Sequence, residues 1–283
     1  MSHLWPILIL MQTSCTHLFF QPDAYLYEDP TKNHPHFEEF TIPSTNQVKL
    51  RAWHLPCQQN SSRGLVIHFH GNAQNMSAHQ VFSEWLAKHG YDVLLFDYRG
   101  YGASSGDPSQ VGLVEDGKAV LQFARDSQKF KSLPKIILGQ SLGGAIALSA
   151  LKEAQTDAQV VILDSTFSSY QEVAQSILAS QWATWPFQWL APLLVTDHAS
   201  PLDALGGIQK VKSWLVIHSK NDPVVPFSNS RPLVSFLSER HLTTWDLTHP
   251  GHITAFAKGS PYRQKILDFL CENLYEHPKM ACS

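Results

Sequence analysis

Residues 135–148 read KIILGQSLGGAIAL, which is the pattern of a buried strand, a tight Gly-x-Ser-x-Gly turn and a helix that opens on small residues. A serine at such a strand-to-helix corner has a strained backbone, so the residues two positions before and after it must be small. Gly139 and Gly143 meet this requirement. The helix would direct free backbone N–H groups toward the serine oxygen, where negative charge develops during acyl transfer. We therefore predict that Ser141 is a nucleophile.

A second match to the same pattern shows how much the surrounding elements matter. Residues 102–106 read GASSG, but the preceding strand is expected to end at Asp97, and Asp107-Pro108 follows where a helix would have to begin. Ser104 is therefore predicted to lie in a loop. The strand and helix around Ser141, and not the five-residue pattern alone, identify it as the nucleophile.

The composition fits one large α/β domain. The chain has 283 residues, of which 43% are hydrophobic, and this is enough to bury a full core. A net charge of −3 provides no strong field for collecting nucleic acid, which is therefore not an expected partner. The cysteines at positions 15, 57, 271 and 282 show no C-x-x-C spacing. This argues against a zinc site or a disulfide framework, and we predict neither a metal nor a cofactor.

Apolar segments alternate with helical patterns along most of the chain. Strands are expected at 65–70, 93–97, 135–138, 159–164, 214–218 and 243–247, helices at 76–89, 113–123, 143–151 and 232–238 and at the C-terminal end, and an antiparallel pair at 40–42 and 48–53. Continuous apolar strands that alternate with helices indicate a mostly parallel sheet covered on both faces. We predict an α/β domain over residues 37–283.

Residues 167–199 depart from this alternation. They include Trp182, Trp185 and Phe187 and are broken by two prolines. One interpretation is an extra helical pair that fills a gap in the core. The other, which we favour, is a small helical cap, because ligands of open α/β sheets bind outside the carboxyl ends of the strands, where this insert begins and ends. The three aromatic side chains would then line an apolar substrate pocket.

A serine nucleophile needs a base to take its proton and a carboxylate to orient that base. The loops after the last two strands offer Asp222 and, further on, two histidines. His249 precedes a proline, which restricts it to an extended conformation, whereas His252 follows a flexible glycine, so we predict His252 as the base. Asp222 is the predicted acid, and Asp164 is the alternative because a carboxylate one strand earlier could also reach the histidine.

An oxyanion hole needs two N–H groups that point at one spot. Leu142, directly after the nucleophile, is expected to supply one of them. The other is expected from the loop after the strand at 65–70, where a glycine lets the backbone come close; Asn72 is our choice and Ala73 the alternative. His70 is expected to brace this loop through a hydrogen bond between its imidazole and the backbone.

Residues 1–36 are expected to lead into the domain. An apolar run at 4–11 is followed by Cys15, which is typical of a short export signal that ends at a lipid-modified cysteine. The run is too short to cross a bilayer as a helix. No Lys or Arg precedes it, and Gln12 stands where such signals usually carry leucine, so a buried N-terminal segment or a misplaced start stays open. The protein is expected to be either exported and membrane-attached through lipidated Cys15, or cytoplasmic.

With these residues in place, the chain resembles the α/β-hydrolase superfamily and, within it, the BEM46-like serine hydrolases. The likeness runs from about residue 37 to 275 and rests on HGNA at 70–73, DYRGYG at 97–102, GQSLG at 139–143, DSTF at 164–167, NDPVVP at 221–226 and GH at 251–252. The resemblance implies an eight-stranded, mostly parallel sheet and a triad of Ser141, Asp222 and His252. LFFQP at 18–22, after Cys15, is similar to the corresponding segment of exported bacterial lipoproteins and favours anchoring.

Other classes of site fit the sequence less well. His68-x-His70 could open a metallohydrolase site, but Asn72 and Ala73 stand where an Asp-His pair would be expected. The glycines at 100 and 102 could suggest a dinucleotide loop, but no helix opens on them and the third glycine is misplaced.

We therefore expect a cofactor-free serine hydrolase that cleaves carboxylic esters of acyl chains through an acyl-enzyme. Thioester or peptide cleavage would use the same groups, and both stay open. A binding protein that kept the fold and lost the chemistry is the non-enzyme alternative, because a fold does not fix a function.

Overall fold

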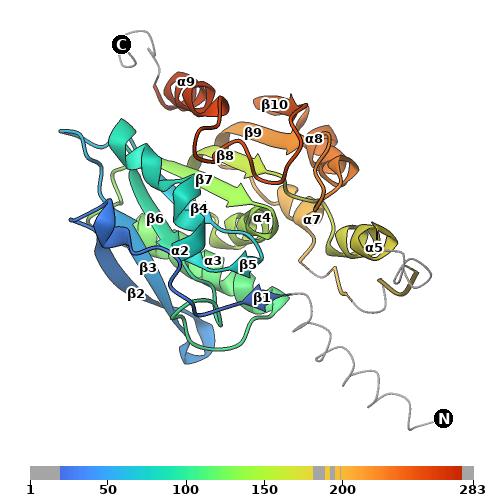
Figure 1. Ribbon diagram of the computed structural model, residues 1–283, viewed down its shortest axis with the longest axis horizontal. Helices are drawn as coiled ribbons and strands as arrows, with labels where there is room; N and C mark the ends of the chain where they lie inside the picture. Colours follow the sequence, from blue (N-terminus) through green and yellow to red (C-terminus); the bar gives the residue numbers. More distant parts are fainter. Residues whose placement is uncertain (1–19, 181–188, 192–194, 198, 276–283) are drawn as a thin grey trace.

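One eight-stranded sheet organises the molecule (Figure 1). The computed structural model describes residues 20–180, 189–191, 195–197 and 199–275. The strand order is β10-β9-β8-β7-β4-β6-β3-β2. The strands are β2 (Glu38–Pro43), β3 (Lys49–Leu55), β4 (Leu65–Phe69), β6 (Asp92–Phe96), β7 (Lys135–Gln140), β8 (Ala158–Asp164), β9 (Val211–Ser219) and β10 (Leu242–Leu247). Neighbours from β10 to β6 are parallel, whereas β3 and β2 join antiparallel. The predicted mostly parallel α/β-hydrolase sheet is confirmed.

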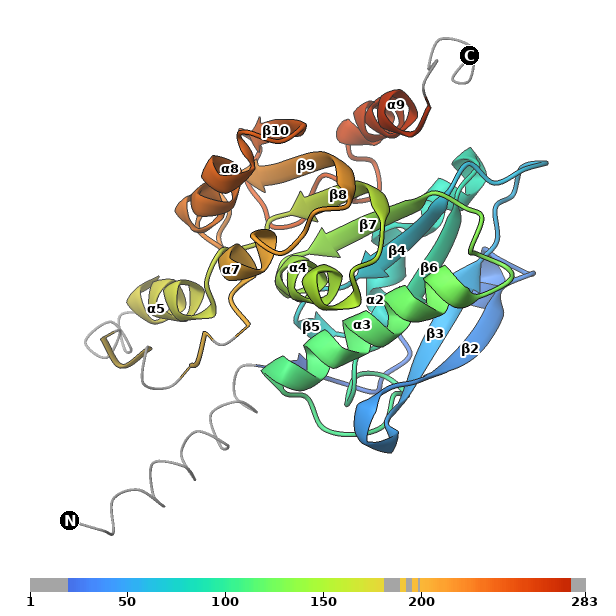
Figure 2. The same ribbon diagram turned by 180° about the vertical axis from the view of Figure 1, so that it is seen from behind.

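Helices cover both faces of this sheet, as expected (Figures 1 and 2). The core of one face includes residues of α3 (Gln110–Asp126), α4 (Leu142–Ala154), α7 (Pro201–Leu205) and α8 (Arg231–Leu237). The core of the other face includes residues of the short helix α2 (Met76–His79) and of the C-terminal helix α9 (Tyr262–Leu274). Each helix has an apolar stripe on the sheet, which is why the parallel strands are apolar at nearly every position.

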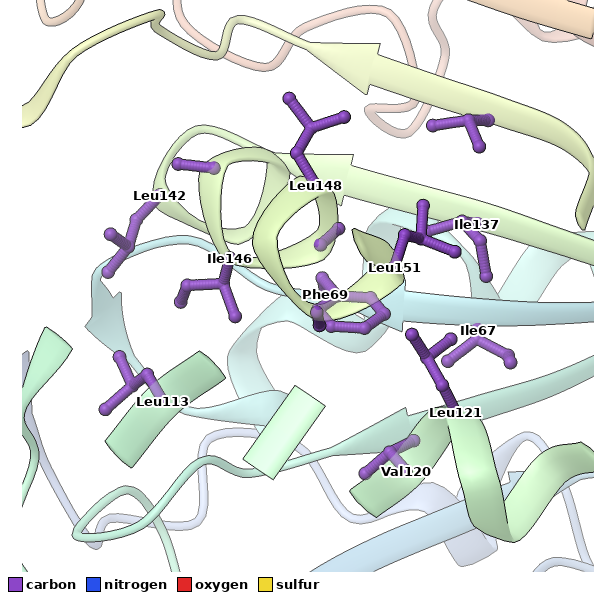
Figure 3. Packing of buried hydrophobic residues seen from close by; sticks show 14 of the residues in the cluster. Ile67, Phe69, Leu113, Val120, Leu121, Ile137, Leu142, Ile146, Leu148 and Leu151 are labelled. Carbon is purple, nitrogen blue, oxygen red and sulfur yellow. The ribbon is translucent and has the colours of Figure 1, made fainter. Parts of the chain in front are cut away.

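The two cores follow from the period-two alternation of the strands. In β4, Ile67 and Phe69 belong to the α3 and α4 side, whereas Val66 belongs to the α9 side, and these three side chains are at most 1% exposed. Figure 3 shows Phe69 at α4, near Ile146 and Leu151, and Ile67 near Leu121. Burying one such side chain stabilises the fold by about 1.5–3 kcal/mol. The sheet is therefore fixed between two apolar layers.

The order in which the chain adds strands to the sheet reverses between β4 and β7. From β4 it continues to its neighbour β6, whereas from β7 it continues to β8 on the opposite side. Phe69 pairs with Gly139, so β4 and β7 end side by side. Ligands of open α/β sheets bind outside the strand ends at such a switch point. The loops after β4 and β7 are the ones that carry Asn72 and Ser141.

The single helix predicted at 76–89 was wrong. The structure has α2 and then two 3-10 helices, Gln80–Phe82 and Glu84–His89. In this segment, side chains donate hydrogen bonds to main-chain carbonyl oxygens. Gln80 Nε2 donates to Ser77 O at 3.1 Å, and Trp85 Nε1 donates to Phe82 O at 2.8 Å. Such bonds compete with the regular ladder of an α-helix. The buried amide of Gln80 and the indole N–H of Trp85 thus favour a break in a segment whose apolar pattern predicts one continuous helix.

Two further features lie outside the main sheet. A small parallel pair joins β1 (Gln21–Pro22) to β5 (Ala73–Gln74). Cys271 in α9 forms a disulfide, so the chain has at least one such bond although the cysteine spacing predicted no disulfide framework. Within the described ranges, no helix is both long and apolar enough to cross a bilayer. Cys15, the proposed lipid attachment site, lies outside the described residues.

Candidate active site

Ser141 occupies the strained corner that the sequence predicts. It lies between β7 and α4 with φ 53° and ψ −122°, in the left-handed half of the Ramachandran map that non-glycine residues rarely adopt. A side chain at Gly143 would overlap the main-chain oxygens of Phe69 and His70, and one at Gly139 would come within 2.5 Å of the Gly144 Cα. Both glycines are therefore required by close backbone packing, and the corner holds Ser141 at the end of β7.

Two hydrogen bonds fix the main chain of this corner. The Ser141 N–H donates to Asp164 O at 2.9 Å, and the Thr166 hydroxyl donates to Ser141 O at 2.7 Å. Thr166 follows β8, the neighbour of β7, so the next strand of the sheet supports the serine. This support offsets the cost of the strained conformation, which is on the order of 1–3 kcal/mol.

Asp222 and His252 are in contact. Asp222 follows β9 and His252 follows β10, and Asp222 Oδ2 lies 2.8 Å from His252 Nδ1. The other carboxylate oxygen accepts the N–H groups of Val224 at 2.8 Å and Val225 at 3.0 Å. Burial alone would raise the pKa of Asp222, but the hydrogen bonds from His252 and from these two N–H groups lower it below its usual value. The carboxylate therefore stays ionised and holds the imidazole by one nitrogen.

The alternative residues have other surroundings. His249 is exposed, and its carbonyl accepts from the Ser219 hydroxyl at 2.5 Å. Asp164 is buried and accepts from Gln140 Nε2 at 3.1 Å. Burial raises the pKa of Asp164 to about 6, and this outweighs the hydrogen bond from Gln140. Of the two carboxylates considered, Asp222 is the one hydrogen-bonded to the predicted base.

A cavity of about 350 Å³ opens beside Ser141. Most of its described lining is apolar and comes from the insert at 167–199, which contains α5 (Tyr170–Ser180), and from the loop after Asp222. The lining residues are Gln21, Asn72, Ser141, Leu142, Phe167, Val173, Ala174, Ile177, Leu178, Ala191, Val195, Val224 and Val225. The insert thus contributes walls to a pocket at the nucleophile. Trp182, Trp185 and Phe187, which we predicted to bind substrate, lie outside the described residues.

Asn72 and Leu142, the predicted oxyanion residues, line this same cavity with Ser141. The Asn72 side chain accepts the Tyr101 hydroxyl at 3.0 Å. Ala73, the alternative, is exposed and pairs with β1 in the small sheet. His70 makes the expected contact with the backbone, because its Nδ1 lies 2.8 Å from Gly71 O.

Three residues that the sequence analysis left out also support the site. Gln21 lines the cavity from the N-terminal side. Gln140 holds the buried Asp164, and the Ser165 hydroxyl accepts the N–H of Ile253, the residue after His252, at 3.2 Å. Their roles depend on contacts between distant parts of the chain, and no local sequence signal points to them.

The residues of the discarded alternatives are engaged elsewhere. His68 contacts Ser83 Oγ through Nδ1 and Gln140 Oε1 through Nε2, each at 2.9 Å, and burial lowers its pKa to about 3. Within the part of the chain that the structure describes, no three His, Cys, Asp or Glu side chains are grouped to hold a metal. The Ser104 hydroxyl donates to Asp97 O at 2.8 Å and accepts from Arg51 N, as a structural loop serine does.

Comparison with known proteins places this chain in a family. A family model described as "Serine aminopeptidase, S33" matches residues 60–210. YfhR of Escherichia coli strain K12, described as uncharacterized, is 30% identical over 263 residues, which cover 90% of this chain and 87% of YfhR. Protein bem46 of Schizosaccharomyces pombe is 25% identical over 249 residues, which cover 86% of this chain and 80% of bem46.

A solved structure with the same fold is the esterase Pf2001 of Pyrococcus furiosus. It superposes with a TM-score of 0.72 at 22% identity, over 90% of this chain and 100% of the esterase. At this identity the likeness shows the fold alone. The family model covers more than half of the chain and the relatives cover most of it, so this protein belongs to the α/β-hydrolase superfamily, in the serine hydrolase family that includes the BEM46-like proteins.

Proposed function

We propose that this protein is a serine hydrolase that cleaves carboxylic esters of apolar acyl chains through an acyl-enzyme. The observation that carries the proposal is the apolar cavity at Ser141, close to a buried carboxylate that is hydrogen-bonded to His252. An acyl chain that fills such a cavity loses its contact with water, and each buried CH₂ group contributes about 0.8 kcal/mol to binding.

In the proposed mechanism, Asp222 keeps the proton of His252 on Nδ1, so that Nε2 is free to accept the proton of Ser141. The serine oxygen attacks the ester carbonyl, and the N–H groups of Leu142 and Asn72 stabilise the oxyanion. His252 then gives the proton to the departing alcohol, which leaves Ser141 acylated. In the second half, water gives a proton to His252 and attacks the acyl group, and the proton returns to Ser141 as the acid leaves.

The cavity lining favours an ester over a substrate with a charged end. Beyond Gln21, Asn72 and Ser141, every described lining residue is apolar. An aminopeptidase substrate carries an ammonium group, and a buried charge is costly unless an opposite charge or several hydrogen-bond partners meet it. The described walls supply apolar surface and two amide side chains. A neutral acyl chain is the better match, although the family description refers to an aminopeptidase.

The first experiment is to label the purified protein with a fluorophosphonate probe. Wild type is compared with Ser141→Ala and with Ser104→Ala, which removes the serine of the second Gly-x-Ser-x-Gly match. We expect wild type and Ser104→Ala to be labelled and Ser141→Ala to be unlabelled. Labelling that persists in Ser141→Ala, or a well-folded wild type that is never labelled, would contradict the proposal and favour a non-catalytic binding protein.

The second experiment distinguishes the bond that is cleaved. p-Nitrophenyl esters of increasing chain length, acyl thioesters and aminoacyl p-nitroanilides are compared by kcat/KM. We expect the esters to be the best substrates and kcat/KM to rise as the acyl chain fills the cavity. An anilide or a thioester that exceeds every ester would show that the cavity serves another substrate class.

Membrane attachment through Cys15 is a separate proposal that rests on the sequence. The support is the apolar run before Cys15 and the LFFQP segment after it. Expression in a bacterial host with a clickable fatty acid should label wild type but not Cys15→Ala. Equal labelling of the two proteins, or none in either, would contradict this proposal.

A further inference from the structure

The chain from Phe20 to Glu28, which we name the N-terminal strap, runs along the loop that carries Asn72. Its first part pairs in parallel with this loop, Gln21 opposite Ala73 and Pro22 opposite Gln74 (Figure 1). Phe20 is 4% exposed and belongs to the core on the α3 and α4 side of the sheet. Phe20 therefore anchors the start of the strap in the packed structure, whereas Tyr25, Leu26 and Tyr27 are exposed.

The strap reaches the predicted oxyanion residue directly. The Gln21 N–H donates to Asn72 Oδ1 at 3.2 Å, and the Tyr101 hydroxyl donates to the same oxygen at 3.0 Å. An oxyanion hole works only if its N–H groups are held in place before the charge develops, because this avoids reorganisation during the reaction. Two donors restrict the rotation of the Asn72 side chain, and the pairing of Gln21 with Ala73 holds the main chain one residue further along.

Asn75 links the loop to the strap. Its Nδ2 lies 2.9 Å from Asp23 Oδ1, 3.2 Å from Asp23 O and 2.8 Å from Tyr25 O. Its Oδ1 faces the other way and accepts the Ser77 N–H at 3.0 Å, which caps α2. Asn75 is 2% exposed, so water does not replace these bonds readily. One buried amide thus joins the strap to the first turn of α2.

Three further hydrogen bonds connect the strap to neighbouring segments. The Tyr27 N–H donates to Ser77 Oγ at 3.0 Å, Gln80 Nε2 donates to Glu28 O at 2.8 Å, and the Gly102 N–H donates to Asp23 O at 2.8 Å. The strap is therefore also bonded to α2, to the 3-10 helix that follows it and to the loop after β6. Gln21 in addition lines the cavity with Asn72 and Ser141.

We propose that the strap is a working part of the active site: it positions the Asn72 N–H for the oxyanion, with Gln21 and Asn75 as positioning residues. This inference rests on the proposed hydrolase function. It makes the N-terminal segment necessary for turnover even though the nucleophile, acid and base all lie more than a hundred residues further along the chain.

The variant that tests it is Asn75→Asp. Aspartate keeps the oxygen that caps α2, but it replaces the Nδ2 donor by an oxygen that faces Asp23 Oδ1, so the link becomes a repulsion. We expect kcat for p-nitrophenyl butyrate to fall about tenfold, because a misplaced oxyanion donor costs part of the 10²–10³ that removing one costs. KM should change less than about twofold, since the acyl pocket is not altered.

Two further variants separate positioning from a general loss of stability. The double variant Asp23→Asn with Asn75→Asp restores the side-chain bond with donor and acceptor exchanged, but the oxygen at position 75 still faces the main-chain oxygens of residues 23 and 25. We therefore expect its kcat to lie between that of Asn75→Asp and that of wild type. Asn273→Asp is the matched control, because it removes a similar bond, Asn273 Nδ2 to Phe269 O at 2.8 Å, from a buried position in α9. It should lower the urea midpoint and leave kcat unchanged.

The outcomes are distinct. A wild-type kcat in Asn75→Asp, a kcat of the exchanged pair no higher than that of Asn75→Asp, or an equal loss of kcat in Asn273→Asp would each overturn the proposed role of the strap. Hydrogen exchange of residues 70–80 gives a readout without turnover, and it should be faster in Asn75→Asp than in the exchanged pair. If wild type neither hydrolyses esters nor reacts with the probe, the proposed function fails, and the exchange data still decide whether the strap fixes the loop.

Discussion

The substitution Asp222→Asn should prevent His252 from acting as the base and leave the fold intact. Asp222 Oδ1 accepts two main-chain N–H groups, and an asparagine oxygen can take its place in both bonds. The asparagine NH₂ then points at His252 Nδ1, where the carboxylate oxygen lay at 2.8 Å. Nδ1 must now accept a hydrogen bond, so the ring proton moves to Nε2. In this tautomer His252 cannot take the proton of Ser141.

The expected loss follows from this tautomer change. In a Ser-His-Asp triad of known mechanism, the same Asp-to-Asn change lowers kcat by about 10⁴. We therefore expect kcat/KM for p-nitrophenyl butyrate to fall by about 10⁴, which is about 5.5 kcal/mol of transition-state stabilisation. The urea midpoint should stay close to that of wild type, because the two main-chain bonds are kept. Steady-state kinetics and urea unfolding on the same preparations measure both quantities.

Asp164→Asn is the matched control for this prediction. Asp164 accepts from Gln140 and is not bonded to His252, so the same change there should keep kcat/KM within about tenfold of wild type. The reasoning would be refuted if Asp164→Asn lost about 10⁴ and Asp222→Asn retained activity. That result would assign the orienting carboxylate to β8.

Three other predictions concern stability and the pocket. Burial raises the pKa of Asp164 from 3.8 to about 6, so on acidification the folded state binds this proton before the unfolded state does. Wild type should therefore gain about 2 kcal/mol of stability relative to Asp164→Asn as the pH falls from about 7 to about 4. A difference in the free energy of unfolding between the two proteins that does not change with pH would contradict this. Gly143→Ala should cost about 3 kcal/mol or more, because its Cβ would overlap two main-chain oxygens, whereas Gly206→Ala, with its nearest neighbour at 3.8 Å, should keep the wild-type urea midpoint. Ala174→Trp should fill the cavity and lower kcat/KM at least about tenfold for p-nitrophenyl octanoate and less than twofold for the acetate; equal effects on the two esters would show that the cavity does not bind the acyl chain.

The sequence alone determined the features that depend on local chemistry. The apolar strands and intervening helices indicated the sheet, because burial on both faces leaves continuous apolar runs in each strand. The Gly-x-Ser-x-Gly turn identified Ser141, because only small residues fit where the backbone of α4 passes close to β4. The order of the loops also selected Asp222 and His252, which the structure brings together.

Other features were decided only by the tertiary structure. The break after α2 depends on side-chain bonds of Gln80 and Trp85 in a buried setting, so the apolar pattern could not show it. The sequence left both Asp164 and Asp222 within reach of the base, and only the positions of the loops showed which one is bonded to His252.

The N-terminal strap is the clearest case. Gln21 and Asn75 are ordinary polar residues in the sequence, and Gln21 lies 120 positions before Ser141. Their importance comes from contacts with Asn72 and Asp23 that form only when the loop after β4 and the strap fold against each other. Local patterns report the backbone and the immediate neighbours of a residue, whereas a hydrogen bond between distant segments depends on where the whole chain places them.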